Sequence, residues 1–309
     1  MCWSGAVDLS SANGATSVTI NMAAGSSLTG GLADTANATL LTLNVDGSAT
    51  IGAGVTTYIA DTTTAANVEV DSGMTLTLAG TGAFTVTSID LDGGSLTVNA
   101  AKTITGLIDG NDETEGTLNV IDATDGESDL GTFASAVGAT QTLAAINIGS
   151  ATKGGDASFA STTAATAVTL TGGNAAGENA GGVFVGNATI TTLTLVGGGN
   201  ATADATAEFR SALTATTIVL NDATGQAELT INALNGAQDI AGTIDAATAG
   251  EGKLIVIDGD AGAAAEASTF TGNVGATASL LAIEIGTAAG AADSASAVFD
   301  GTTDLPPEN

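Results

Sequence analysis

Apolar and polar residues alternate along most of the chain. Short runs such as "FTVTSIDL" (84–91), "TTLTLVG" (191–197) and "ELTIN" (228–232) place Val, Ile, Leu or Phe at alternate positions. A period of two is typical of half-buried β-strands, and the Gly, Asn and Asp that bound these runs are typical of turns. The Ala-rich stretch 261–268 lacks a helical apolar stripe, so we interpret it as a loop. The pattern therefore predicts an all-β protein.

The sequence also repeats at long range. The phrase "GTLNVID" (116–122) returns as "GKLIVID" (252–258), an offset of 136 residues. The phrase "VGATQTLAAINIG" (137–149) returns as "VGATASLLAIEIG" (274–286), an offset of 137 residues. The register therefore holds over a long stretch with a single slip, which indicates a repeat architecture.

Fainter matches extend the repeat over the whole chain. They divide it into degenerate units, of which the middle one is the longest and the last stops abruptly. The predicted units are about 3–82, 83–211 and 212–309, with an insertion at 172–209 in the middle unit.

Short strands, Gly/Asn/Asp corners and small side chains predict one elongated parallel β-helix, a β-solenoid, over residues 1–309. Each coil of such a fold buries its inward residues against the coils above and below. With roughly 20–25 residues per coil and coils about 4.8 Å apart, the chain would form about a dozen coils. The alternative is a tandem of β-sandwiches, which would need longer strands linked by hairpins.

The charge balance excludes several functions. The chain has 4 Lys+Arg, 33 Asp+Glu and no His, for a formal net charge of −29. Nucleic acid is excluded because phosphate backbones are held by clusters of Lys and Arg, and the cations here are scattered singly. No run of about 18 apolar residues predicts a membrane-spanning helix. The single cysteine, Cys2, excludes an internal disulfide framework.

We expect no enzymatic activity and no required cofactor. Without His, and with aromatics at 3%, the chain offers few groups that could bind and cleave a sugar polymer. Pairs of carboxylates can hydrolyse glycosides, but 33 acidic residues guarantee chance pairs. A polysaccharide-active enzyme is therefore the least favoured hypothesis, and no catalytic residue is assigned.

Carboxylates gather in the segment 108–129 and, less densely, in its later copy. Hard oxygen ligands of this kind suit calcium. The spacing does not match an EF-hand loop, and the glycine–aspartate nonapeptides that bind calcium in other solenoids are lacking. A solvated loop face is the alternative interpretation, and Asp122 and Asp258 also suit corners of coils. The candidate calcium ligands are Asp109, Asp112, Glu113, Asp122, Asp125, Asp258 and Asp260.

Two weaker patterns remain. The tripeptide "NAT" provides glycosylation sequons at Asn37, Asn187 and Asn200. Thr-x-Thr phrases such as "TTLTL" occur on flat ice-binding solenoids, but there the threonines align from coil to coil. The irregular spacing in this sequence argues against such an alignment.

The phrases "GSLTVNAAKTITG" (94–106) and "ATITTLTLVGGG" (188–199) resemble bacterial extracellular β-strand-repeat proteins: S-layer proteins, autotransporter-type passengers and adhesins. The resemblance covers the whole chain and rests on composition. It implies a secreted protein at the cell surface that acts as a coat, fibre or stalk, in some relatives organised by calcium.

We therefore expect a structural extracellular protein that assembles with itself, head to tail or laterally, into a layer, sheath or filament. Open strand edges at the ends of a solenoid favour such contacts. Trp3, Phe299 and Leu305 are the candidate interface residues. The alternative is an adhesin module that recognises a glycan or a host surface, with the insertion at 172–209 as its binding element.

Overall fold

The computed structural model is all-β, and neighbouring strands run parallel throughout. It describes residues 67–78, 83–98, 101–122, 130–234, 237–258, 267–286 and 295–305 in full, together with the strand backbone of several segments nearer the N-terminus. Among the described residues no α-helix occurs, and so none could cross a membrane. The predicted parallel β-helix is confirmed, and the tandem of hairpin-linked sandwiches is wrong.

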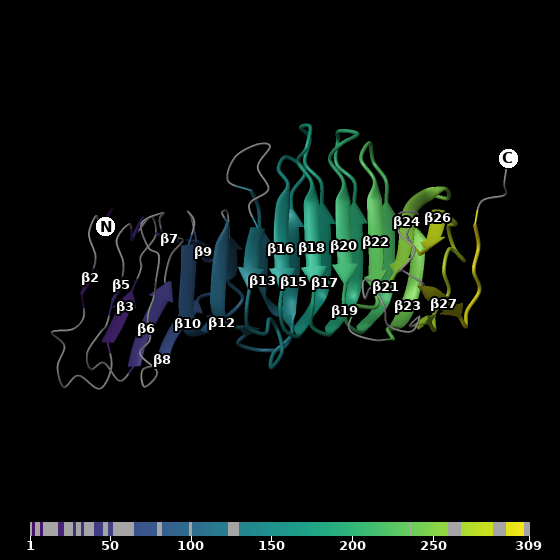
Figure 1. Cartoon of the computed structure of the whole chain (residues 1–309). Helices are drawn as coiled ribbons and strands as arrows, with labels where there is room; N and C mark the ends of the chain where they lie inside the picture. Colours follow the sequence, from purple (N-terminus) through teal and green to yellow (C-terminus); the bar gives the residue numbers. More distant parts are fainter. Residues whose placement is uncertain are drawn as a thin grey trace.

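The strands are short and follow one another along the whole chain (Figure 1). Their bounds are β1 Cys2–Trp3, β2 Val7–Asp8, β3 Val18–Asn21, β4 Ser27–Leu28, β5 Leu32–Ala33, β6 Leu40–Val45, β7 Ala49–Ile51, β8 Ala65–Val70, β9 Thr75–Leu78, β10 Gly82–Leu91, β11 Ser95–Val98, β12 Lys102–Gly110, β13 Glu115–Val120, β14 Leu130–Phe133, β15 Leu143–Gly149, β16 Gly155–Phe159, β17 Thr163–Thr171, β18 Ala180–Phe184, β19 Ala188–Val196, β20 Ala205–Phe209, β21 Leu213–Asn221, β22 Ala227–Asn232, β23 Asp239–Ala246, β24 Glu251–Ile257, β25 Ala267–Phe270, β26 Leu280–Ile285 and β27 Ser296–Phe299.

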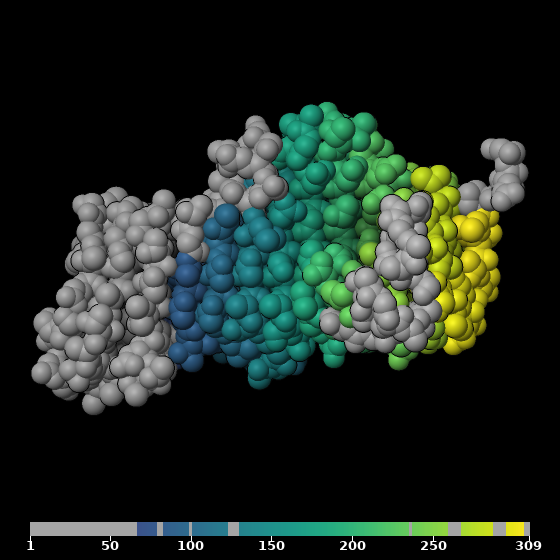
Figure 2. Space-filling view, in the orientation of Figure 1, coloured from purple at the N-terminus to yellow at the C-terminus, as the bar shows by residue number. Residues whose placement is uncertain are grey.

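Each coil of the solenoid has three sides. In one coil, residues 163–165 form the first side, residues 167–171 the second and β18 the third. The next coil repeats this order with residues 188–190, residues 192–196 and β20. Strands on the same side pair from coil to coil, so the backbone hydrogen bonds run along the axis of an elongated body (Figures 1 and 2). Long strands bend around a corner and join the sides into a 13-stranded and a 12-stranded sheet.

A slip in the burial alternation marks the corner inside the long strands. In β17, β19 and β21 the first, third, sixth and eighth residues are buried. Two consecutive outward residues, Thr166 and Ala167 in β17, let the strand turn while its apolar side chains stay inside. Gly106 and Gly242 occupy corners with φ of 141° and 112°, a region that glycine tolerates best. A Cβ at Gly242 would lie 1.9 Å from the carbonyl oxygen of Ala215, so no side chain fits there.

A column of phenylalanines fills the interior behind the third side. Phe133, Phe159, Phe184 and Phe209 lie in register on successive coils. Their ring centroids are 4.9, 4.9 and 4.5 Å apart with nearly parallel planes. The ring spacing follows the strand spacing of about 4.8 Å, so the backbone ladder places the rings at stacking distance.

The long-range repeat does not correspond to a whole number of coils. Residues 117–120 of the first copy pair on the second side of the solenoid, with β11 and β15. The equivalent residues 253–256 pair on the third side, with β22 and β26. The sheets also run without interruption across residues 82/83 and 211/212, where the predicted units meet. The repeated sequence therefore encodes a strand and its turns. Its first copy lies on the second side of the solenoid, and its second copy lies on the third side.

The predicted insertion at 172–209 is a regular part of the solenoid. Its three strands, β18, β19 and β20, pair with the coils on both sides of them. Its turns stack as well: Asn179 Oδ1 accepts a hydrogen bond from the Asp204 N–H at 2.8 Å, and Asp204 Oδ1 accepts one from the Gln226 N–H at 2.8 Å. The segment adds coils to the rod, so it is not a separate protruding element.

We expect Phe184→Ala to lower the free energy of unfolding by about 3–5 kcal/mol, because it opens a cavity inside the phenylalanine column. Val183→Ala, on the outward face of the same strand, is the matched control and should cost far less. Chemical denaturation followed by far-UV circular dichroism measures both. Equal losses for the two variants would contradict the stacked core.

Candidate functional site

The structure separates the predicted calcium ligands into distinct places. Asp109 is buried at the end of β12, where its Oδ1 accepts a hydrogen bond from the Thr140 N–H at 3.2 Å. Asp112 and Glu113 lie in the exposed turn that follows. Asp122 is buried beyond the far end of β13, and a six-residue strand is about 20 Å long. Asp122 is therefore too far from the other three carboxylates to share one ion with them.

The remaining predicted ligands belong to other parts of the chain. Asp258 is 2% exposed and is the first residue after β24. Asp122 is the second residue after β13. These two equivalent aspartates thus both lie where a strand gives way to a turn. Asp125 and Asp260 lie outside the described residues.

An acidic cluster that the sequence analysis missed lies on the early coils. Carboxylate oxygens of Glu69, Asp71 and Asp92 lie within 4.8 Å of one another. On the first side, Glu69, Asp90 and Asp109 form a ladder in register. Hard oxygen atoms in this arrangement are of the type that calcium prefers. A signal was present in the sequence, because "VEVDSG" (68–73) returns as "IDLDGG" (89–94) one coil later.

The ladder places like charges directly opposite each other, which is unfavourable in a sheet. Burial raises the pKa of Asp90, the hydrogen bond from Ser88 Oγ to Asp90 Oδ2 at 3.1 Å lowers it, and the nearby Asp109 raises it further. The net effect is a raised pKa, so ionised Asp90 destabilises the folded chain at neutral pH.

Asp90→Asn should raise the free energy of unfolding at pH 7 by about 0.5 kcal/mol, because it removes the middle charge of the ladder. A raised pKa in the folded state means that the variant's advantage is present at neutral pH and disappears as the pH falls below 3.8, the ordinary value. Urea denaturation at several pH values in the presence of a chelator measures this. The exposed Asp112→Asn is the control, and a destabilised Asp90→Asn at pH 7 would refute the expectation.

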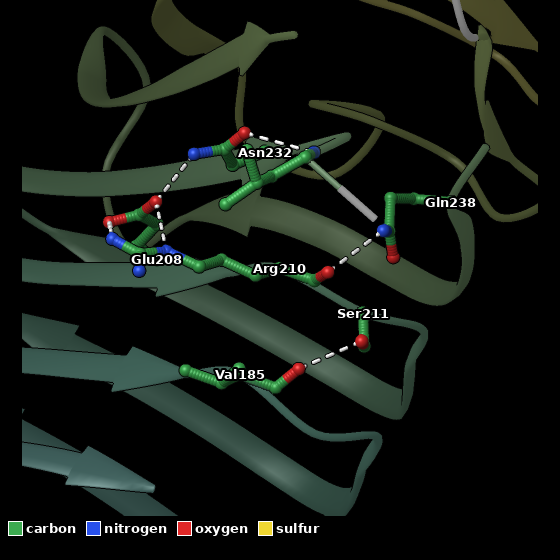
Figure 3. A network of polar contacts seen from close by, with 7 residues as sticks. Val185, Glu208, Arg210, Ser211, Asn232 and Gln238 are labelled. Atoms are coloured by element: carbon green, nitrogen blue, oxygen red, sulfur yellow. Dashed lines mark hydrogen bonds and ion pairs between the residues drawn. The ribbon is translucent and has the colours of Figure 1, made fainter. Parts of the chain in front are cut away.

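A second polar group surrounds Glu208 on the third side (Figure 3). Arg210 donates to both carboxylate oxygens of Glu208, from Nε at 2.8 Å and from Nη2 at 3.1 Å. Asn232 Nδ2 donates to Oε1 of the same carboxylate at 2.6 Å. Gln238 Nε2 donates to the carbonyl oxygen of Arg210 at 3.1 Å, and Ser211 Oγ donates to a carbonyl oxygen of the preceding coil at 2.8 Å. The network ties neighbouring coils together at one corner.

Glu208 also lines a groove across the third side, together with Asp156 and Thr206. Gly181 and Gly182 contribute to its lining without side chains. Burial raises the pKa of Asp156, and a hydrogen bond from the Gly181 N–H opposes that rise. Two strand spacings, about 10 Å, separate the strands of Asp156 and Glu208. Because Glu208 is held by Arg210 and Asn232, we interpret it as the centre of a structural network.

The pH dependence of this network follows from Glu208. Burial alone would raise the pKa of Glu208, but hydrogen bonds from Arg210 and Asn232 and the charge of Arg210 lower it below 4.5. A lowered pKa means that the network stabilises the fold above pH 4.5 and that this stability is lost as the pH falls through the lowered value.

We therefore expect Arg210→Met to lower the free energy of unfolding at pH 7 by about 1 kcal/mol, with a smaller loss well below pH 4.5. Lys253→Met is the control, since Lys253 makes only single contacts with Glu228 and Glu284, at 3.7 and 2.9 Å, and these ion pairs should contribute less than the two-pronged contact of Arg210. Denaturation curves from pH 3 to pH 8 give the comparison. An Arg210→Met loss independent of pH would contradict the role of Glu208.

The sequons are partly accessible. Asn187 is exposed just before β19, and Asn200 is half-buried in a turn where its Oδ1 accepts a hydrogen bond from the Thr202 N–H at 3.1 Å. Asn37 lies outside the described residues.

No family model, curated protein or solved structure matches the chain.

Proposed function

We propose that the chain is a structural protein of an extracellular assembly and that its solenoid associates end to end with a second copy. The observation that carries the proposal is the last described coil, where strand edges and apolar side chains are exposed together. The resemblance of the sequence to cell-surface repeat proteins supports the same setting.

Among the described residues, the last coil has no further strand paired to it on two of its sides. Strand β26 is the terminal strand of the 12-stranded sheet, and β27 is the terminal strand of the 13-stranded sheet. An edge of this kind is a template for pairing with another chain. A further coil from a second copy would continue the same parallel hydrogen bonding.

Apolar side chains accompany this edge. Ile285 is 48% exposed, whereas its partners on the two preceding coils, Val256 and Ile231, are each 1% exposed. Leu281 and Val298 on the same coil are 49% and 46% exposed. Phe299 stacks on Phe270 with centroids 4.9 Å apart, and Leu305 is 44% exposed. Burying such side chains contributes about 25 cal/mol per Å² of apolar surface. Phe299 and Leu305, two of the predicted interface residues, thus belong to the coil that carries the proposal.

End-to-end contact joins two different surfaces, and such contacts form open filaments when the symmetry does not close. Stacking along the axis also keeps the carboxylates on the sides of two copies apart. The side chain of Trp3, the third predicted interface residue, lies outside the described residues, so its contact with the last coil remains a prediction.

Ile285→Asp should abolish the assembly, because Ile285 is the exposed end of the inward column Ile231–Val256–Ile285 and a second copy would cover it. Leu130→Asp is the matched control: Leu130 is comparably exposed, at 46%, but lies in the middle of the rod. Electron microscopy and light scattering of the purified chain, with and without calcium, measure filament length and mass.

The unsubstituted chain and Leu130→Asp should both form filaments or higher oligomers, and Ile285→Asp should be monomeric with an unchanged far-UV spectrum. A chain that is monomeric at all concentrations in both conditions would overturn the proposed function. If the chain assembles only in the presence of calcium, the end-to-end contact includes a bound cation.

A further inference from the structure

Two columns of outward residues run along the third side of the solenoid, in register from coil to coil. The first column consists of Leu130, Asp156, Gly181, Thr206, Glu228, Lys253 and Ala282. The second column consists of Thr132, Ser158, Val183, Glu208, Thr230, Ile255 and Glu284. The groove across the third side includes Gly181 of the first column and Val183 of the second.

The later part of these columns shows how an ammonium group is held on this side. Lys253 Nζ lies 3.7 Å from Glu228 Oε1 and 2.9 Å from Glu284 Oε1. Glu228 lies one coil before Lys253 in the first column, and Glu284 lies one coil after it in the second column. The ammonium group therefore bridges two carboxylates that lie two coils apart and in different columns.

The same arrangement of carboxylates recurs at the groove, with a glycine in place of the lysine. Asp156 lies one coil before Gly181 in the first column, and Glu208 lies one coil after it in the second column. Because glycine has no side chain, the groove opens between the two carboxylates. The chain thus holds two carboxylate pairs of one geometry, of which only the later pair is bridged by an ammonium group of the chain.

The space above Gly181 is lined by oxygen atoms on one side and on the other. A Cβ added to Gly181 would overlap Asp156 Oδ1 and lie 3.8 Å from Thr206 Oγ1. An ammonium group in the groove can therefore donate hydrogen bonds to Asp156 and Thr206. Its alkyl chain can lie against Leu130 and Val183, which also line the groove, and Leu130 is 46% exposed.

The distribution of charge distinguishes Asp156 from the other carboxylates of the two columns. Those carboxylates each pair with a cation of the chain, Glu208 with Arg210 and both Glu228 and Glu284 with Lys253. Asp156 pairs with no cation among the described residues. Burial raises the pKa of Asp156, as expected of a carboxylate that loses water and gains no positive partner. A cation from outside the chain would supply that partner.

A metal ion fits the groove less well than an ammonium group does. Calcium takes about six to eight oxygen ligands, whereas the two carboxylates of the groove come from strands about 10 Å apart. One of them, Glu208, already accepts hydrogen bonds from Arg210 and Asn232 (Figure 3). We propose that the groove binds a primary alkylammonium group, with Asp156 as its main partner and Gly181 as the position that leaves space for it.

Binding of n-butylammonium, which corresponds to a lysine side chain without its backbone, tests the proposal. The probe is added to the isotope-labelled full chain, and NMR follows the amide resonances of Gly181 and Thr206. Tetramethylammonium at the same concentration is the control, because it has the same charge but no N–H donor. If the chain assembles, all measurements use the Ile285→Asp background, and if it is monomeric they use the unsubstituted chain. The test is therefore independent of the proposed end-to-end contact.

Variants locate the binding. Asp156→Asn should weaken the binding of n-butylammonium about tenfold or more, whereas the exposed Asp112→Asn should leave it unchanged. Gly181→Lys should abolish binding, because a lysine at this position would repeat the arrangement of Lys253 and fill the groove. Lys253→Gly should create a second site between its two former carboxylate partners. Far-UV circular dichroism shows that each variant is folded.

The expected result is a saturable shift with n-butylammonium that is absent with tetramethylammonium and lost in Asp156→Asn. No saturable shift without these substitutions, equal shifts with tetramethylammonium, or shifts that persist in Asp156→Asn would overturn the proposal. Lysine blocked at its α-amino and carboxyl groups is then compared with cadaverine. Tighter binding of blocked lysine supports the proposal with a lysine of a polypeptide as the source, and tighter binding of cadaverine supports it with a free amine.

Discussion

The fold depends on the parallel hydrogen-bond ladder between coils. This ladder fixes the distance between coils at about 4.8 Å and places each residue over its counterpart. Like side chains at the same position of neighbouring coils therefore come into contact. The contact is stabilising where the rings of Phe133, Phe159, Phe184 and Phe209 stack. It is destabilising where the carboxylates of Glu69, Asp90 and Asp109 face each other. The core and the acidic cluster are two consequences of one constraint.

The three-sided coil explains which residues the two copies of the long-range repeat have in common. Its two copies are placed one side apart, so Thr117 and Asn119 face outward on the second side, whereas their equivalents Lys253 and Ile255 face outward on the third. What is retained is inward: Leu118 and Val120 recur as Leu254 and Val256, all buried. A shared binding site would need the outward residues on the same side, so the repeated phrase encodes a way of folding.

The period of two predicted the strands, and the short strands with Gly/Asn/Asp corners and small side chains predicted the parallel solenoid, because each coil then buries its alternate residues against the next. The regularity of 172–209 could not be read from sequence identity, since its coils share a register but few residues with the others. The spacing of Phe159, Phe184 and Phe209, 25 residues apart, was a usable signal of coil length. Lys102 gave no such signal: in the sequence it is one of four singly scattered cations, yet it is 1% exposed. Its position matches the buried Gln238 at the offset of 136 residues, and only the packing around it shows that the site is internal.

The distribution of charge favours association along the axis of the rod. A chain with a net charge of −29 repels its own copies, and the repulsion is strongest where charged sides would face each other. The last described coil presents Ile285 and the edges of β26 and β27 along the axis, where backbone pairing can outweigh that repulsion. Axial association is therefore the arrangement in which two copies gain backbone pairing while the charged sides of the rods stay apart.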